Sequence, residues 1–278
     1  PILWAAYAEA GIIPRKELLN LRKHDSVLEG HPTPRMRMVK IATGSLGQGL
    51  PAGLGMALAK KLKKDKGKVY VLLGDGECAE GSVWEAANIA SYYKADNLCA
   101  VIDVNRLGQS QQTLEGSHLK EYKARLEAFG WKAIIAKGHS IKELLSAFRA
   151  AEKSSKPCAI IAGTVKGKGI PFAEDRNGWH GRPLSREQMD EALKNIGDPE
   201  ITLRSAVRYR KAGRSSSSFT PTGYNNGEMV ATRSAFGNAL VKLGKNKDIV
   251  ALDGDVRNST RTEAFFRTFP KRGFESFI

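Results

Sequence analysis

Four short apolar runs, rich in β-branched residues, alternate with helical patterns in the first part of the chain. The helix-like stretches cover residues 82–93, 118–129 and 140–153, and the apolar runs read KVYVLLGD, LCAVIDV, KAIIAK and CAIIAGTV. Strands that are apolar on both faces and separated by helices form parallel sheets that are covered on each side. The alternation therefore predicts an α/β fold, with a parallel sheet and helices on both of its faces.

The composition of the chain changes after residue 200. Residues 201–228 contain RSAVRYRKAGRSSSSFTPTGYNNGE, which is rich in Arg, Ser and Gly and is typical of a linker. Regular patterns resume with a helix in ATRSAFGNALVKLG and a strand in DIVALDGD. We therefore expect a first domain over 1–200, a linker over 201–228, and the beginning of a second α/β domain over 229–278.

The net charge of +15 is compatible with nucleic-acid binding, because basic surfaces attract phosphate backbones. The densest basic run is KKLKKDKGK at residues 60–68, and a solvated helix end explains it more simply. No interleaved aromatic residues or nucleic-acid motif accompany that run. We therefore expect no nucleic-acid partner, whereas phosphorylated small molecules would suit this charge.

Apolar runs and cysteines restrict the class of protein further. No apolar run approaches the ~18 residues that a membrane span requires, so we expect no membrane association. Cys78, Cys99 and Cys158 lie far apart and form no CxxC pair, which argues against a structural zinc site. Such cysteines suit a reducing compartment, and we expect a cytoplasmic location.

Polar groups follow two neighbouring strands of the predicted sheet. Asp75 stands in Gly-Asp-Gly after the first apolar run, and Asn105 follows the second run in Asp-Val-Asn. In parallel sheets, ligands gather beyond the carboxyl ends of the strands. A carboxylate oxygen, an amide oxygen and the Leu107 carbonyl, with diphosphate oxygens and water, would complete the octahedral shell of Mg²⁺. The alternative is a pair of unrelated polar turns.

The segment GDGECAEGSVWEAANIASYYKADNLCAVIDVNRLGQS resembles the thiamin-diphosphate-binding signature, in the form characteristic of transketolases. Further motifs occur in the order and spacing of that family: GHPTP, ATGSLGQGL, KGKGI, GWHG, ATRSAFGNALVKLG and ALDGDVRNST. The resemblance covers nearly the whole chain except the Ser-rich linker. EGSVWEAA and NRLGQS favour transketolases over deoxyxylulose-phosphate synthases and 2-oxo-acid dehydrogenases.

The resemblance implies that thiamin diphosphate is anchored through Mg²⁺, or Ca²⁺ or Mn²⁺ in its place. The metal ligands would be Asp75, Asn105 and the carbonyl of Leu107. Lys166 would neutralise diphosphate charge, and Lys168 competes for that role by proximity alone. The residues that would lie beside the cofactor are Gly44, Ser45, Leu46 and Gly76.

The resemblance also assigns substrate-binding residues. His31 and His180 would contact the sugar and move protons, and His180 would also reach the diphosphate. Arg233 and Ser259 would grip the phosphate of the sugar phosphate, and Asp255 would line the cofactor site. Without the resemblance, His31 is a turn histidine and Arg233 is a solvated residue in the first turn of a helix.

The implied reaction is transfer of a two-carbon ketol group from a ketose phosphate to an aldose phosphate, in the pentose phosphate pathway. In the family the cofactor lies between two subunits, so a homodimer is expected. In the family's order, a catalytic glutamate follows Ile278, and a helix with further substrate histidines precedes Pro1. The alternative is therefore a catalytically incomplete fragment that only binds Mg²⁺ and thiamin diphosphate.

Overall fold

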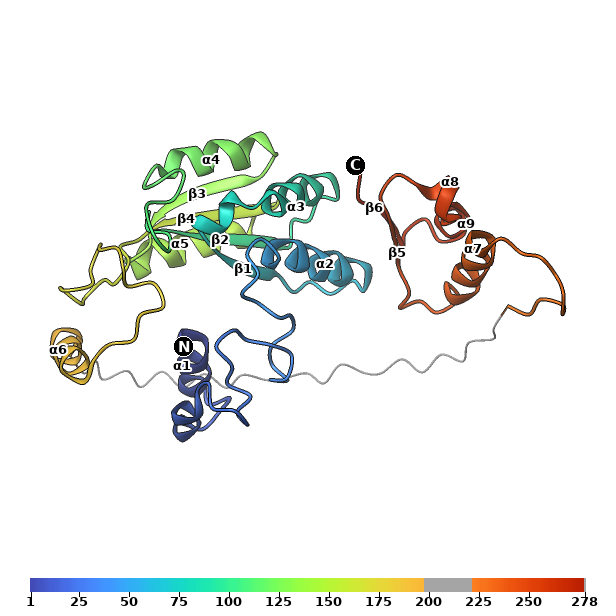
Figure 1. Cartoon of the computed structure of the whole chain (residues 1–278). Helices are drawn as coiled ribbons and strands as arrows, with labels where there is room; N and C mark the ends of the chain where they lie inside the picture. The colour runs from blue at the N-terminus through green and yellow to red at the C-terminus, as the bar shows by residue number, and fades with distance from the viewer. Residues whose placement is uncertain (198–221, 278) are drawn as a thin grey trace. The chain divides into compact units, whose positions relative to one another are not determined.

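The computed structural model describes residues 1–197 and 222–277. The chain divides into two compact units, residues 1–208 and residues 209–278, which are labelled by element in Figure 1. Most of the predicted linker, and with it the boundary placed after residue 200, lies outside the described residues. The described end of that linker, residues 222–228, contains neither helix nor strand.

The first unit is built on a four-stranded sheet. Its strands pair in the order β1-β2-β4-β3, so β4 lies between β2 and β3 although it is the last of the four in sequence. Every pair is parallel, which confirms the predicted parallel sheet. The strands are β1 (Val69–Gly74), β2 (Leu98–Val104), β3 (Lys132–Lys137) and β4 (Cys158–Gly163).

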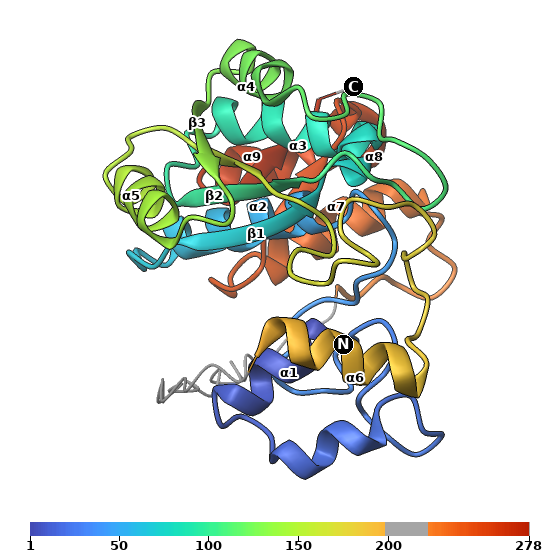
Figure 2. The same cartoon turned by 90° about the vertical axis from the view of Figure 1, so that its left-hand side faces the viewer.

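Helices cover both faces of this sheet, as the sequence predicts. Small and apolar side chains of three helices pack with β1 and β2 into the main core on one face. The fourth helix lies on the other face of the sheet (Figure 2). Its Ala147 and Ala151 pack against Ile160 and two cysteines. The helices of the first face are α2 (Gly49–Leu62), α3 (Gly81–Tyr92) and α4 (Leu119–Ala128), and that of the second face is α5 (Ile141–Glu152).

Other elements of the first unit have no counterpart in the predicted pattern. The N-terminal residues form a separate small cluster around the buried Trp4, whose indole N–H donates to the Glu29 carbonyl at 2.9 Å. A capping box between Ser185 and Gln188 starts the last helix. These elements are α1 (Ile2–Glu9), the 3₁₀ helices η1 (Arg15–Asn20) and η2 (Gly76–Ala79), and α6 (Arg186–Ile196).

The basic run lies at a helix end and forms ion pairs, and the cysteines are buried. Lys60 and Lys61 lie in the last turn of α2, and they form ion pairs of 2.6 Å with Asp65 and Asp96. The three cysteines are free and buried, and burial, with the charges of two nearby carboxylates, raises the pKa of Cys78 to about 12. Among the helices within 1–197 and 222–277, none is long and apolar enough to span a membrane.

The second unit contains a short parallel β-α-β arrangement. Its strands pair with Ala251 opposite Gly273, and residues 222–277 also contain three helices. The sequence predicts the helix and the first strand but not the second strand, which has only three residues. The elements are α7 (Thr232–Leu243), β5 (Ala251–Asp253), α8 (Arg257–Thr260), α9 (Glu263–Thr268) and β6 (Gly273–Glu275).

Candidate functional site

The carboxyl ends of β1 and β2 lie side by side. Gly74 at the end of β1 is in register with Asp103 of β2, and the Asp75 N–H donates to the Asp103 carbonyl at 3.1 Å. Asn105 follows directly after β2. The parallel pairing therefore brings the two polar strand ends to one edge of the sheet, where bound ligands are expected in this class of fold.

The Asp75 carboxylate is buried and is surrounded by donors. Its Oδ1 accepts the Gly76 N–H at 2.8 Å, and its Oδ2 accepts the N–H groups of Asn105 at 3.0 Å and Arg106 at 2.6 Å. The Thr113 hydroxyl donates to the same Oδ2 at 3.4 Å. Because Asp75 binds the backbone of Asn105 directly, the two residues occupy one locality and not two unrelated turns.

The Asn105 side chain is held between the strand and the following loop. Its Oδ1 accepts the Leu107 N–H at 3.2 Å, and its amide nitrogen donates to Asp103 Oδ1 at 3.5 Å. Asp103 also accepts the hydroxyl of Thr164, which follows β4. Asp103 is thus a supporting residue that the sequence reasoning missed, although an acid in the apolar run LCAVIDV is a visible signal.

Lys166, and not Lys168, reaches this edge. Its Nζ donates to the carbonyls of Leu107 at 3.0 Å and Gly108 at 3.2 Å, and it lies 3.1 Å from His180 Nδ1. An ammonium group has only donors, so Nδ1 is the acceptor in that contact. Lys168 instead forms an ion pair of 2.9 Å with Glu174. The structure therefore groups Lys166, His180 and Leu107.

These residues fit a divalent cation that takes oxygen ligands. The Leu107 carbonyl already accepts from a cationic group, and a carboxylate and an amide oxygen belong to the same locality. Hard oxygens of this kind suit Mg²⁺, Ca²⁺ or Mn²⁺, and further ligands must come from a bound molecule or from water. No cluster of three or more His, Cys, Asp or Glu that could hold a metal occurs in the described part of the chain.

A glutamate that the sequence reasoning missed ties the glycine-rich loop GSLGQG to the turn after β1. Glu77 accepts the Gly47 N–H at 2.9 Å through Oε1 and the Gly74 N–H at 3.3 Å through Oε2. The Ser82 hydroxyl donates to the Gly47 carbonyl at 2.9 Å. Gly47 has a φ of +81°, and a Cβ there would lie 2.7 Å from the Cβ of Glu80. Only glycine suits this close approach.

The other residues of the glycine-rich loop are open to solvent. Gly44, with a φ of +112°, lies against the His31 ring, where an added Cβ would be 2.7 Å from Cγ. His31 and Gly44 are therefore neighbours. Ser45 is exposed, and Leu46 leaves 57% of its surface exposed, so both are accessible to a ligand.

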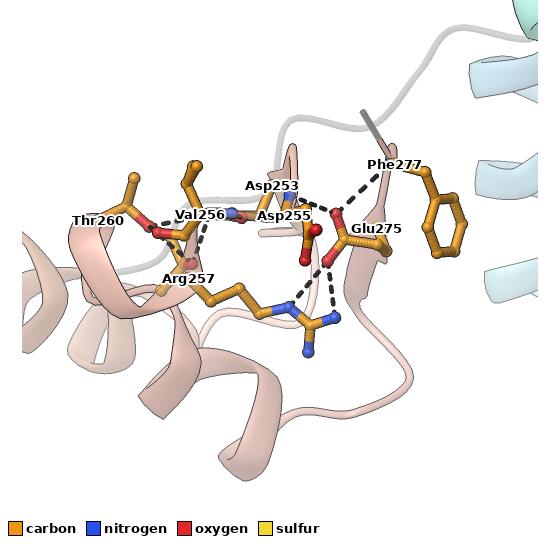
Figure 3. A network of polar contacts seen from close by, with 8 residues as sticks. Asp253, Asp255, Val256, Arg257, Thr260, Glu275 and Phe277 are labelled. Carbon is orange, nitrogen blue, oxygen red and sulfur yellow. Dashed lines mark hydrogen bonds and ion pairs between the residues drawn. The ribbon is translucent and has the colours of Figure 1, made fainter.

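The predicted site residues of the second unit are Arg233, Asp255 and Ser259, and none of the three lines the cavity between α7, α8 and α9. Arg233 is exposed in the first turn of α7, and Ser259 is exposed in α8. The helices α7, α8 and α9 border a cavity of about 540 Å³, which is lined by the neighbours of these residues, Ser234 and Asn258. The Asp255 N–H donates to Glu275 Oε1 at 2.7 Å (Figure 3).

Known proteins resemble the chain along its whole length. Residues 12–207 match the family described as "Transketolase, thiamine diphosphate binding domain". The transketolases of Rattus norvegicus and Homo sapiens are each 46% identical over 288 residues, which cover 100% of this chain and 46% of theirs. The crystal structure of Campylobacter jejuni transketolase has a TM-score of 0.81 and 27% identity, and the match covers 95% of this chain and 48% of that one.

Proposed function

The chain belongs to the transketolase family, and from this premise we propose that the carboxyl edge of its first sheet binds the diphosphate of thiamin diphosphate through a divalent cation. The observation that carries the proposal is the sharing of one locality by the Asp75 carboxylate, Asn105 and the Leu107 carbonyl. The family consists of transferases. The chain spans 46% of the length of the rat and human relatives, so activity and substrates are proposed for the whole protein.

Asp75, Asn105 and the Leu107 carbonyl are the proposed protein ligands of Mg²⁺, with Ca²⁺ or Mn²⁺ as substitutes. Lys166 adds a positive charge beside them and compensates diphosphate charge. Glycine backbones approach a ligand closely because they carry no side chain. By resemblance to the family, the remaining proposed cofactor contacts are Gly44, Ser45, Leu46, Gly76, His180 and Asp255.

Thiamin diphosphate, when bound, supplies the chemistry that cleaves and forms the carbon–carbon bond. The chain's own residues position the substrate and move protons. We assign His31 and His180 to substrate hydroxyls, because imidazole exchanges protons near neutral pH. Arg233 and Ser259 are assigned to the substrate phosphate, for which a guanidinium fork is well suited.

The proposed reaction of the whole protein is transfer of a two-carbon ketol group from a ketose phosphate to an aldose phosphate. A cytoplasmic homodimer in the pentose phosphate pathway is the corresponding cellular proposal. For the 278-residue chain taken alone, the proposal is narrower: it binds Mg²⁺ and thiamin diphosphate, and turnover belongs to the whole protein. Release of an aldose phosphate from a ketose phosphate by this chain alone would contradict the narrower proposal.

Calorimetric titration of the chain with thiamin diphosphate, with and without MgCl₂, tests the binding site. We expect binding only with the divalent cation. Asp75→Asn keeps the shape of the side chain but removes its charge, so affinity should fall by about 100-fold or more. Asp190→Asn, on the exposed surface of α6, is the matched control and should bind normally. Equal affinity of the Asp75 variant and the unmodified chain would refute the site.

A further inference from the structure

Two loops meet at the proposed cation site. The ion loop, residues 105–113, follows β2, and the lysine loop, residues 164–181, follows β4 and carries both Lys166 and His180. Lys166 contacts the ion loop from one side through the carbonyls of Leu107 and Gly108. A second connection between the two loops involves residues that have no assigned role.

This second connection is an ion pair between Arg106 and Asp175. Nη2 of Arg106 donates to Asp175 Oδ2 at 2.6 Å and approaches the Asp175 carbonyl at 3.4 Å. The backbone of Arg106 is engaged as well, since its N–H donates to Asp75 at 2.6 Å and its carbonyl accepts from Thr113 at 2.9 Å. Arg106 therefore contacts the proposed metal ligand and the lysine loop at the same time.

Asp175 completes a closed circuit of contacts. Its N–H donates to the Lys166 carbonyl at 2.8 Å, while the Lys166 ammonium returns to Leu107, the residue next to Arg106. Arg106 and Asp175 have φ values of 63° and 57° respectively, in the left-handed region that residues other than Gly seldom adopt. Such backbone persists where the surrounding contacts over-determine it.

We propose that the Arg106–Asp175 ion pair is a latch that positions Lys166 and His180 at the cation site, which rests on the function proposed above. The side chains of the pair are 28% and 48% exposed, and an ion pair of that exposure adds little to global stability. Its effect is local, because it closes the circuit that joins the metal ligand Asp75 to the lysine loop. Arg106 and Asp175 are positioning residues: they act through Lys166 and His180.

Arg106→Gly is the sharpest variant. Glycine adopts a positive φ without strain, so the backbone contact to Asp75 is kept while the guanidinium is lost. We expect unchanged or higher thermal stability together with affinity for thiamin diphosphate, in the presence of Mg²⁺, that is lower by about tenfold. A purely structural role for residue 106 predicts the opposite, namely that Gly binds as well as Arg.

Asp175→Asn and the double variant test whether the two residues act as one unit. Each single variant should weaken binding to a similar extent, and the double variant should be no weaker than either one. In each variant, hydrogen exchange in residues 164–181 should be faster than in the unmodified chain, while β1 and β2 exchange as before. Arg186→Gln removes an exposed ion pair with Asp190 on α6 and serves as the control with normal binding.

The outcomes separate the latch from the proposed function. If the unmodified chain fails to bind thiamin diphosphate with Mg²⁺, the proposed function fails and the latch fails with it. If the unmodified chain binds and the latch variants bind equally well, only the latch is overturned. Strictly additive losses in the double variant, or unchanged exchange in residues 164–181, would also overturn it.

Discussion

The strands β1 and β5 both end at an Asp-Gly dipeptide, but the two aspartates have different hydrogen-bond partners. β1 leads into LLGDGE and β5 into ALDGDV, in the first and second units respectively. Asp75, after β1, accepts mainly backbone N–H groups from a loop. In the same loop, the Leu107 carbonyl accepts from the Lys166 ammonium group. This is the loop to which we assign the proposed cation site.

Asp253, at the end of β5, accepts mainly side-chain hydroxyls and one backbone N–H. Its carboxylate accepts the Val256 N–H at 2.8 Å and the hydroxyls of Thr260 and Thr262 at 2.8 and 2.7 Å. Beside it, Glu275 receives two bonds from the Arg257 guanidinium, at 2.9 and 2.6 Å (Figure 3). The comparison shows that two similar Asp-Gly strand ends have different hydrogen-bond partners, mostly backbone N–H groups at Asp75 and mostly hydroxyls at Asp253.

Asp253→Ala should give the largest change in stability. It removes the acceptor of the Val256 N–H and of the hydroxyls of Thr260 and the buried Thr262, at a cost of about 3 kcal/mol in the free energy of unfolding of the second unit. Denaturant-dependent hydrogen exchange of β5 and β6 measures this cost. Asp253→Asn keeps one acceptor oxygen and should cost about 1 kcal/mol. If added Mg²⁺ changed the loss of stability caused by Asp253→Ala, Asp253 would serve a ligand as well as the fold, and the contrast with Asp75 would fail.

Glu77→Ala should give the next largest change, in the first unit. It removes the acceptor of two backbone N–H groups and frees the glycine-rich loop from the turn after β1, so we expect a loss of about 1–2 kcal/mol. All tryptophans lie in the first unit, namely Trp4, Trp84, Trp131 and Trp179. Urea unfolding followed by tryptophan fluorescence therefore reports on that unit alone.

The same variant should also bind thiamin diphosphate more weakly, because the loop that carries Gly44, Ser45 and Leu46 loses its anchor. Glu77→Gln keeps one acceptor oxygen and should lie between Ala and the unmodified chain. Glu121→Gln, at an exposed position of α4, should stay within about 0.5 kcal/mol of the unmodified chain. A Glu77→Ala variant with unchanged unfolding and binding would show that the loop is held by other contacts.

Acid should produce the smallest change, and it should act on the second unit. Burial raises the pKa of Asp253 and Glu275, but hydrogen bonds to Asp253 from Thr262, Val256 and Thr260, and to Glu275 from Arg257, outweigh it. Both pKa values therefore lie below their ordinary values of 3.8 and 4.5. Between the folded and ordinary pKa values the unfolded chain binds more protons, so stability falls as the pH falls.

This contribution is fully present above about pH 5, and it is lost as the pH falls through the lowered pKa values. The measurement is the difference in stability between the unmodified chain and Asp253→Asn, by denaturant-dependent exchange of β6 from pH 6 to pH 3. The difference should shrink toward pH 3. A difference that stays constant over this range would show that the carboxylates do not prefer their ionised form in the folded unit.

The sequence predicts the sheet well, because the apolar runs are long enough for pattern alone to identify strands. The ends of β1 and β2 follow from the same pattern, and the pairing of Asp75 with the Asn105 backbone is what parallel strands require. The strand β6 (GFE) was missed because it contains Gly and Glu around a single apolar residue, whereas the equally short β5 lies within the apolar run IVAL. Local pattern is therefore informative where an element is long and regular.

Residues that support the site from loops, away from the strand ends, could not be predicted. Glu77 binds Gly47 across 30 positions, and Arg106 binds Asp175 across 69 positions. No local period links such pairs, because the contact depends on how the sheet brings separate loops together. The site residues found from the sequence were those at strand ends or in motifs resembling a family, and their supports emerged only from the fold.

In the four-stranded sheet, β3 pairs with β4 alone, and β4 also joins it to β2. A ribosome releases residues 132–137 before residues 158–163, so β3 waits for its partner for roughly 1–4 s at synthesis rates of about 5–20 residues per second. During that interval β1 and β2 can pair, whereas β3 cannot join them. Lys166 follows β4 directly, so the strand that joins β3 to the sheet and the lysine of the proposed cation site leave the ribosome together.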